Sequence, residues 1–203
     1  DLVDFSDPTV RGRCKMRMDW MERIVPHIDL GFCTDGDWVD RDRTGKLVWL
    51  TQGADERVTG VGHWNEDIPN PPPILMTGIH NGGRARASFV DEMQVNYRTA
   101  FNYVQRGLHG RAMADVIAGS KIVLAPDGPV TDRYWSNRVY LTLGYGAFLL
   151  HPWCRDLAGH YEGEEEIVYY RNRDQLHSLI KHFSNHEAER RAIANAGSKR
   201  GGA

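Results

Sequence analysis

Short apolar runs alternate with polar and amphipathic stretches along most of the chain, which predicts an α/β fold. The pattern is clearest in residues 120–152. Residues 121–125 form an apolar run rich in β-branched side chains, typical of a buried strand, and residues 147–150 form a second one. Apolar positions between them predict a helix that starts after Ser136 and Asn137, two good N-cap types. Strand, helix and strand in this order make one turn of a doubly wound parallel sheet.

The start of this helix is the first candidate site. Ligands of doubly wound sheets lie at the carboxyl ends of strands, beside helix N-termini. Ser136, Asn137 and Arg138 are expected there, and together they offer backbone N–H groups, a hydroxyl and a fixed positive charge. This combination suits a phosphate group, although a simple helix cap with a surface arginine is the alternative.

The rest of residues 74–197 continues the alternation. Residues 74–78 (ILMTG) predict a buried strand, and apolar residues spaced by three or four from Phe89 to Val104 predict one amphipathic helix. Gly144 and Gly146 are expected to end the central helix. The remaining elements expected are helices at 111–118 and 154–161, a strand at 166–170, a helix from Asn172 to Phe183, a last helix capped by Asn185 and ending at Gly197, and a disordered tail at 198–203.

The first 62 residues predict less structure. Met16, Trp20 and Ile24 fit one face of a helix, and short strands are expected at 28–34 and 46–50. So few elements would make a poor independent core, so we expect the end of a larger domain whose beginning is missing from the sequence. The polar, proline-rich residues 63–73 are expected to link it to the second domain.

Composition narrows the functional classes. The chain has 25 Lys and Arg against 27 Asp and Glu, a net charge of −2, so binding to nucleic acid is not indicated. No apolar run reaches the roughly 18 residues that a membrane span requires. The three cysteines show neither zinc spacing nor a disulfide framework, which makes a reducing cytoplasm the expected location. The histidines show no metal-ligand spacing either, so no metal site is expected.

A glycine-rich loop after the strand at 74–78 is the second candidate site. Its sequence, GIHNGGRAR, runs from Gly78 to Arg86 and lacks the G-x-G-x-x-G spacing of dinucleotide-binding proteins, which disfavours a redox Rossmann enzyme. Gly78 lets the backbone approach a ligand, and Arg84 adds charge, with Arg86 a weaker candidate. His80 in this loop and His109 in a GLHG loop are further candidates, although most histidines are surface or core residues.

Residues 121–197 resemble the carboxyl-terminal domain of group-1 glycosyltransferases, especially the CgeB-like branch of spore-maturation proteins. The matching pieces are KIVLAP, SNRVYLTLGYGAFLL, DLAGHYEGEEEIVYY and DQLHSLIKHFSNHEAERRAIANAG, with ILMTG and VWLTQGAD fitting upstream. The resemblance implies a GT-B fold, in which two Rossmann-like domains with mostly parallel sheets face each other across a cleft. Residues 1–62 would then be the end of an incomplete acceptor-side domain, and residues 74–197 the nucleotide-sugar-binding domain.

The resemblance also implies a reaction. A hexosyltransferase of this kind moves a sugar from a nucleotide-diphosphate sugar to an acceptor hydroxyl with retention of configuration, and it requires neither a metal ion nor a cofactor. Arg84 and Arg138 would be the catalytic pair that neutralises the diphosphate leaving group. The full set of expected donor-binding residues, from the residue patterns and the resemblance together, is Gly78, His80, Arg84, His109, Ser136, Asn137, Arg138 and Glu166.

One position departs from the family pattern. Related retaining enzymes carry a Glu that binds the donor ribose where this chain has Leu141, and a leucine accepts no hydrogen bond. A non-catalytic, nucleotide-sugar-binding relic of a glycosyltransferase therefore remains the alternative. The nucleobase, the sugar and the acceptor are left open.

Overall fold

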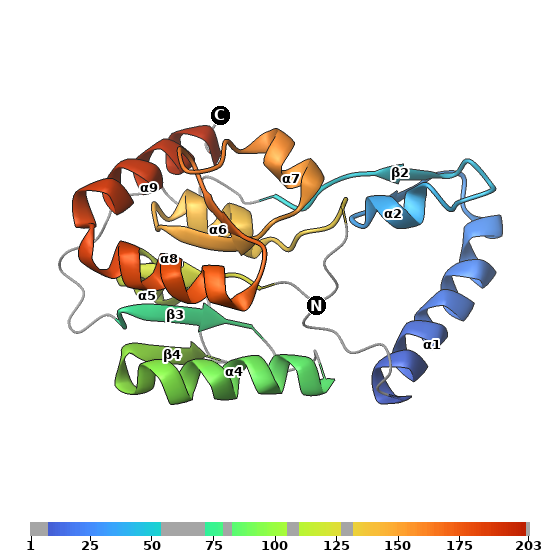
Figure 1. Cartoon of the computed structure of the whole chain (residues 1–203). Coiled ribbons are helices and arrows are strands. Elements are labelled where there is room, and N and C mark those ends of the chain that lie inside the picture. Colours follow the sequence, from blue (N-terminus) through green and yellow to red (C-terminus); the bar gives the residue numbers. More distant parts are fainter. Residues whose placement is uncertain (1–7, 54–71, 79–82, 105–109, 127–131, 202–203) are drawn as a thin grey trace.

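A computed structural model of the chain places residues 8–53, 72–78, 83–104, 110–126 and 132–201 (Figure 1). Its main body is a parallel five-stranded sheet in the order β4-β3-β5-β6-β7. The strands are β3 (Ile74–Thr77), β4 (Phe101–Val104), β5 (Ile122–Leu124), β6 (Leu149–Pro152) and β7 (Val168–Tyr170). The parallel α/β sheet predicted from the sequence is confirmed.

Helices cover both faces of this sheet. Successive side chains of a strand point to opposite faces, so Met76 packs with Phe89 of α4 (Gly83–Tyr97) while its neighbour Leu75 packs with Ile117 of α5 (Gly110–Gly119). α8 (Arg173–Asn185) joins α4 on the first face. The other helices of this domain are α6 (Arg138–Gly144), α7 (Arg155–His160) and α9 (Glu187–Gly201), the last packed against α6 and α8.

A smaller unit precedes the five-stranded sheet, and Figure 1 shows it to one side of that sheet. It consists of α1 (Pro8–Ile24), a short 3-10 helix, β1 (Gly31–Cys33), α2 (Gly36–Val39) and β2 (Leu47–Trp49). β1 and β2 pair in parallel, as expected for the last strands of an α/β domain. We call residues 8–53 the first unit.

The predicted glycine stop of the central helix is confirmed in detail. α6 ends at Gly144, and Gly146 takes a φ of 70°. The N–H of Gly146 donates to the carbonyl of Leu143 at 2.9 Å, and that of Ala147 donates to the carbonyl of Thr142 at 3.0 Å. These two bonds make a Schellman motif, which directs the chain straight into β6.

The amphipathic helix predicted from Phe89 to Val104 is wrong in its second half. α4 ends at Tyr97, a short 3-10 turn follows with Arg98 at a φ of 47°, and residues Phe101–Val104 form the edge strand β4. Phe101, Tyr103 and Val104 suit a short strand as well as the last turn of a helix, and pairing with β3 decides between them.

The end of the chain also differs from the prediction. Asn185 does not cap the last helix, because it is the final residue of α8 and its side chain donates to the carbonyl of Lys181. α9 continues past Gly197 to Gly201, into the tail expected to be disordered. A Cβ at Gly197 would lie 2.9 Å from a methyl group of Leu143, so α9 packs closely on α6, and this contact orders the tail.

Two further sequence predictions concern whole segments. Most of the predicted linker at 63–73 lies outside the described residues. In the part of the chain that the structure places, no helix is long and apolar enough to cross a membrane.

Candidate functional site

The candidate site lies at the carboxyl edge of the sheet, where β3 and β5 end. Arg138, the first residue of α6, reaches across both strand ends. Its Nη1 donates to the carbonyl of Thr77 at 2.9 Å and its Nη2 to the carbonyl of Pro126 at 3.4 Å. Its Nε donates to the hydroxyl of Ser136 at 3.1 Å, which fixes the orientation of the guanidinium plane.

A second guanidinium comes from α4. Arg86 is buried, with 5% of its surface exposed, and its Nη2 donates to the carbonyl of Pro126 at 3.1 Å. Arg86 and Arg138 therefore share one backbone oxygen, although they belong to helices on opposite faces of the sheet. Gly78, Arg86, Ser136 and Arg138 are called the arginine cluster below.

Gly78 makes this convergence possible. It directly follows β3, its φ is 126°, and its N–H donates to the carbonyl of Val104 at 3.1 Å. A Cβ at this position would collide with Nη1 of Arg138 and lie 3.4 Å from Nη1 of Arg86. The guanidinium groups thus occupy the space that any other residue would fill, so both the backbone angle and the packing require glycine.

The chemistry of the arginine cluster suits a multiply charged anion. A guanidinium presents a planar fork of donors that matches the oxygens of a phosphate group, and it stays protonated at any physiological pH. Two such groups beside a hydroxyl, at the edge where doubly wound sheets bind their ligands, can contact two linked phosphates. Among the described residues, no group of three His, Cys, Asp or Glu side chains lies close enough to hold a metal ion.

The structure brings Gly78, Ser136 and Arg138 together as the sequence suggested, but the predicted capping is wrong. Asn137 precedes α6 with helical backbone angles, φ −57° and ψ −15°, and its side chain makes no capping bond. The Ser136 hydroxyl is instead bonded to Arg138. The N–H of Asn137 donates to Oε1 of Gln52, a residue of the first unit, at 2.5 Å.

Glu166 is not brought to the arginine cluster. It precedes β7 and therefore lies at the amino end of that strand, whereas Arg138 lies beyond the carboxyl end of β5. Its carboxylate accepts the N–H of Glu162 at 2.9 Å, within the same turn. The structure thus gives Glu166 a local role in shaping the turn.

The other predicted residues are placed only in part. His80 and His109 lie outside the described residues, and Arg84 is described only as backbone in the first turn of α4. Leu141 is half-buried and packs against the apolar cluster between α5 and the sheet. An apolar side chain therefore fits this position well.

Arg86, the weaker candidate of the glycine-rich loop, has a sequence signal that marks it as buried. Arg86 stands three, four and seven positions before Phe89, Val90 and Met93, which are buried. Residues at these spacings share one helix face, so Arg86 had to point toward the sheet. A buried arginine needs partners for its charge and its N–H groups, so an arginine on a buried helix face is a candidate for a specific role. This spacing could have identified Arg86 as such a candidate from the sequence alone.

Comparisons with known proteins agree with this fold. A family model described as glycosyl transferase-like matches residues 52–201, and the chain belongs to that family. A sucrose-phosphate synthase from Thermosynechococcus elongatus superposes on 93% of this chain with a TM-score of 0.65 and 12% identity. A glycosyltransferase from Rickettsia africae superposes on 85% of it with a TM-score of 0.57 and 8% identity.

At such low identity these two structures show the fold, which is that of GT-B glycosyltransferases. This chain spans 57% of the length of the first structure and 58% of the second. No curated protein sequence gave a significant match.

Proposed function

We propose that this chain carries the donor-binding part of a glycosyltransferase that transfers a sugar from a nucleotide-diphosphate sugar to an acceptor hydroxyl. The observation that supports this most strongly is the convergence of Arg86 and Arg138 on the carbonyl of Pro126, beside Gly78, at the carboxyl edge of the sheet. Membership of the glycosyl transferase-like family supports the reaction class.

In this proposal the two guanidinium groups bind the diphosphate. As the bond between the anomeric carbon and the diphosphate oxygen breaks, negative charge grows on the leaving group, and fixed cations there stabilise the transition state more than the ground state. Arginines can supply this charge without a divalent ion, so we propose a metal-independent reaction. Retention of configuration and membership of the CgeB-like branch remain parts of the proposal that rest on sequence resemblance.

A calorimetric titration with UDP, GDP, ADP and dTDP tests the donor site. We expect one of these to bind with a Kd in the micromolar to millimolar range, about 4–8 kcal/mol of binding free energy. Arg138→Ala should weaken binding by about 1.5–3 kcal/mol, as for a charged hydrogen bond, and Arg86→Met by a similar amount. The control is Arg111→Ala on α5, since the Arg111 side chain is 87% exposed and pairs with Asp115 one turn further along the same helix.

The results of this titration decide whether the donor site lies at the arginine cluster. If a folded wild-type sample binds none of the four nucleotides, or if Arg111→Ala weakens binding as much as Arg138→Ala, the donor site is not at the arginine cluster. Loss of binding confined to the two cluster variants supports it.

A non-catalytic relic is the second candidate, raised by Leu141, which packs among apolar side chains and accepts no hydrogen bond, whereas the family match favours the enzyme. The relic would bind a nucleotide but would neither hydrolyse a nucleotide sugar nor transfer its sugar. Incubation of the matching nucleotide sugar with the protein, followed by chromatography of the released nucleotide, distinguishes the two. Turnover that disappears in Arg138→Ala would rule out the relic.

A further inference from the structure

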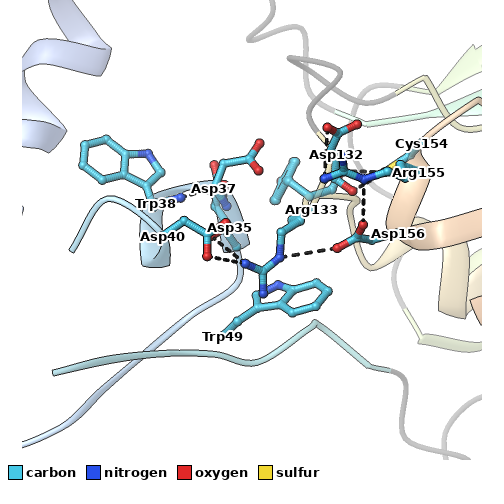
Figure 2. Close-up of polar contacts among 12 residues, drawn as sticks. Asp35, Asp37, Trp38, Asp40, Trp49, Asp132, Arg133, Cys154, Arg155 and Asp156 are labelled. Carbon is cyan, nitrogen blue, oxygen red and sulfur yellow. Dashed lines mark hydrogen bonds and ion pairs between the residues drawn. The ribbon is translucent and has the colours of Figure 1, made fainter. Parts of the chain in front are cut away.

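Arg133 joins the first unit to the domain that carries the arginine cluster (Figure 2). It lies on the segment between β5 and α6, five residues before Arg138. Its Nη1 donates to Asp40 at 2.5 Å, just after α2, and its Nε lies 3.4 Å from the carboxylate of Asp156 on α7. Its Cζ lies 4.3 Å from the ring centroid of Trp49 on β2. One cation thus contacts three elements that belong to two different units.

The geometry of these contacts depends on a guanidinium group. Arg133 uses one nitrogen for each carboxylate while its planar face covers the Trp49 ring, and only 22% of its side chain is exposed. A lysine ammonium carries the same charge but cannot direct donors to two carboxylates and stack on an indole ring at once. A partly buried cation between two carboxylates is also screened less by salt than a surface pair.

The first unit also holds the segment between Arg133 and Arg138 at other points. The N–H of Gly36 donates to the carbonyl of Arg133 at 3.0 Å. Trp49 meets Trp135 edge to face, with ring centroids 5.8 Å apart. The bond from the Asn137 N–H to Gln52 adds a third contact, directly before Arg138. The residues that lead into the arginine cluster are therefore packed by β2, α2 and the chain that follows β2.

The domain that contains the five-stranded sheet contacts this segment from the other side. The carbonyl of Asp132 accepts from the Cys154 thiol at 3.2 Å and from the N–H of Asp156 at 3.1 Å. The segment is thus fixed from both sides, and the Arg133 side chain is the one group in Figure 2 that contacts carboxylates of both sides.

We propose that Arg133 is a positioning residue, which fixes the first unit on the segment leading into α6 and thereby sets the position of Ser136 and Arg138 for binding a diphosphate. The part of this inference that concerns the diphosphate rests on the proposed function. The part that concerns the two units does not, and it can be tested without any ligand.

A distance measurement tests the link between the units. Spin labels at Val48→Cys on β2 and Val95→Cys on α4, both exposed positions, report the separation of the units once Cys14 and Cys33 are replaced. Cys154 is kept, because its thiol is buried and bonds to Asp132. We expect a narrow distance distribution in this background, a clearly broader one with Arg133→Gln, and an intermediate one with Arg133→Lys. Asp40→Asn removes the ion pair of Arg133 with the first unit and leaves the one with Asp156 in place, so it should broaden the distribution too, whereas Arg111→Gln should leave it unchanged. A narrow distribution in folded Arg133→Gln and Asp40→Asn proteins would overturn the proposal.

Nucleotide titration tests the consequence for the arginine cluster. With the nucleoside diphosphate that binds the wild type best among UDP, GDP, ADP and dTDP, Arg133→Gln should raise Kd by about 2- to 30-fold, as for couplings through a packed network. Arg138→Ala should weaken binding while leaving the distance distribution narrow. A broadened distribution with an unchanged Kd would overturn the positioning role. If the wild type binds no nucleotide, the proposed function fails, and the distance measurement still decides whether Arg133 links the units.

Discussion

Gly78 shows how one residue can determine a whole site. Its positive φ and its contact with two guanidinium groups have different physical causes, so they can be separated by substitution. Gly78→Ala should lower the free energy of unfolding by about 1–3 kcal/mol, through backbone strain and displacement of Arg138. It should also weaken nucleotide binding, which thermal melting and calorimetry on one sample would measure.

Gly110 provides the control for this experiment. It also has a positive φ, 54°, but a Cβ there meets nothing within 4 Å. Gly110→Ala should therefore cost only the backbone strain, about 1–2 kcal/mol, and leave the nucleotide Kd unchanged. Equal effects of both variants on Kd would show that the arginine cluster does not depend on the space above Gly78.

The stability of the first unit depends on pH through the carboxylate of Asp42. Its carboxylate accepts the N–H and hydroxyl of Thr44 at 2.9 and 2.7 Å, and the N–H groups of Lys46 and Leu47 at 3.0 and 2.9 Å. These bonds, led by those of Thr44, lower the pKa of Asp42 from 3.8 to about 2. Because the folded pKa lies below the unfolded one, the stabilisation is complete above about pH 4 and disappears as the pH falls through about 2.

This response can be measured against a substitution. Asp42→Asn should lower the melting temperature at pH 7, because an amide cannot accept all four bonds. The difference in melting temperature between wild type and Asp42→Asn should become smaller as the pH falls from 4 to 2. Asp91→Asn, on the exposed side of α4, is the matched control and should change the melting temperature little. A difference in melting temperature that stays constant from pH 7 to pH 2 would contradict the lowered pKa of Asp42.

At the scale of elements, the sequence predicted the buried strands best. Ile74–Thr77 and Ile122–Leu124 are buried on both faces, so their apolar runs are continuous and unambiguous. The capping of α8 was also predictable, since Asn172 and Gln175 both lie in one local motif, and the Gln175 N–H donates to Asn172 at 2.8 Å. Phe101–Val104 could not be assigned, because its choice of strand depends on β3, which lies more than twenty residues earlier.

Within the candidate site too, local contacts could be predicted from the sequence, and contacts between distant segments could not. The proximity of Ser136 to Arg138 is local and was predictable. The approach of Arg86 and Arg138 to the carbonyl of Pro126 depends on the register of β3 against β5 and on helices from opposite faces, and no local pattern encodes it.

The contact of α9 with α6 yields a prediction at the scale of elements. A Cβ at Gly197 would meet the carbonyl of Glu166 and lie 2.9 Å from Leu143, so Gly197→Ala should force α9 away from α6. We expect it to lower the free energy of unfolding by about 1–3 kcal/mol, as overpacking does. Urea titration followed by circular dichroism measures the change.

Gly159 in α7 is the matched control, because a Cβ there meets nothing within 4 Å. Gly159→Ala should be neutral or raise stability by up to about 1 kcal/mol, since alanine favours the helix. If both variants shift stability in the same direction, the close contact at Gly197 is not what holds α9.

At the scale of the whole molecule, the two parts differ in how well they bury apolar surface. The five-stranded domain buries apolar clusters on both faces of its sheet, whereas the parallel pair β1–β2 exposes one face, where Phe32 and Val48 are paired neighbours. The exposed large apolar side chains of this region are Met16, Trp20, Leu30, Phe32, Val48 and Leu50. Exposed strands with such side chains promote association.

We therefore expect this 203-residue chain to self-associate with rising concentration, and Phe32→Lys to reduce that association. Phe32 is 66% exposed, so the substitution should change stability little. Sedimentation velocity over a range of concentrations gives the measurement. Val95→Lys on α4, at a 74% exposed and isolated apolar residue, should have no such effect. Identical sedimentation of wild type and Phe32→Lys would refute the expectation.

The junction at Arg133 has a consequence for the newly made protein. Gly36 and Arg133, which are bonded to each other, stand 97 positions apart in the chain. At a synthesis rate of 5–20 residues per second, the ribosome needs about 5–20 seconds to make the stretch between them. Until Arg133 has been made, Trp49 lacks the guanidinium group that stacks on its ring, and Asp40 lacks the cation that pairs with it. We therefore expect the first unit of the nascent chain to depend on chaperones that shield exposed apolar side chains until Arg133 has been made.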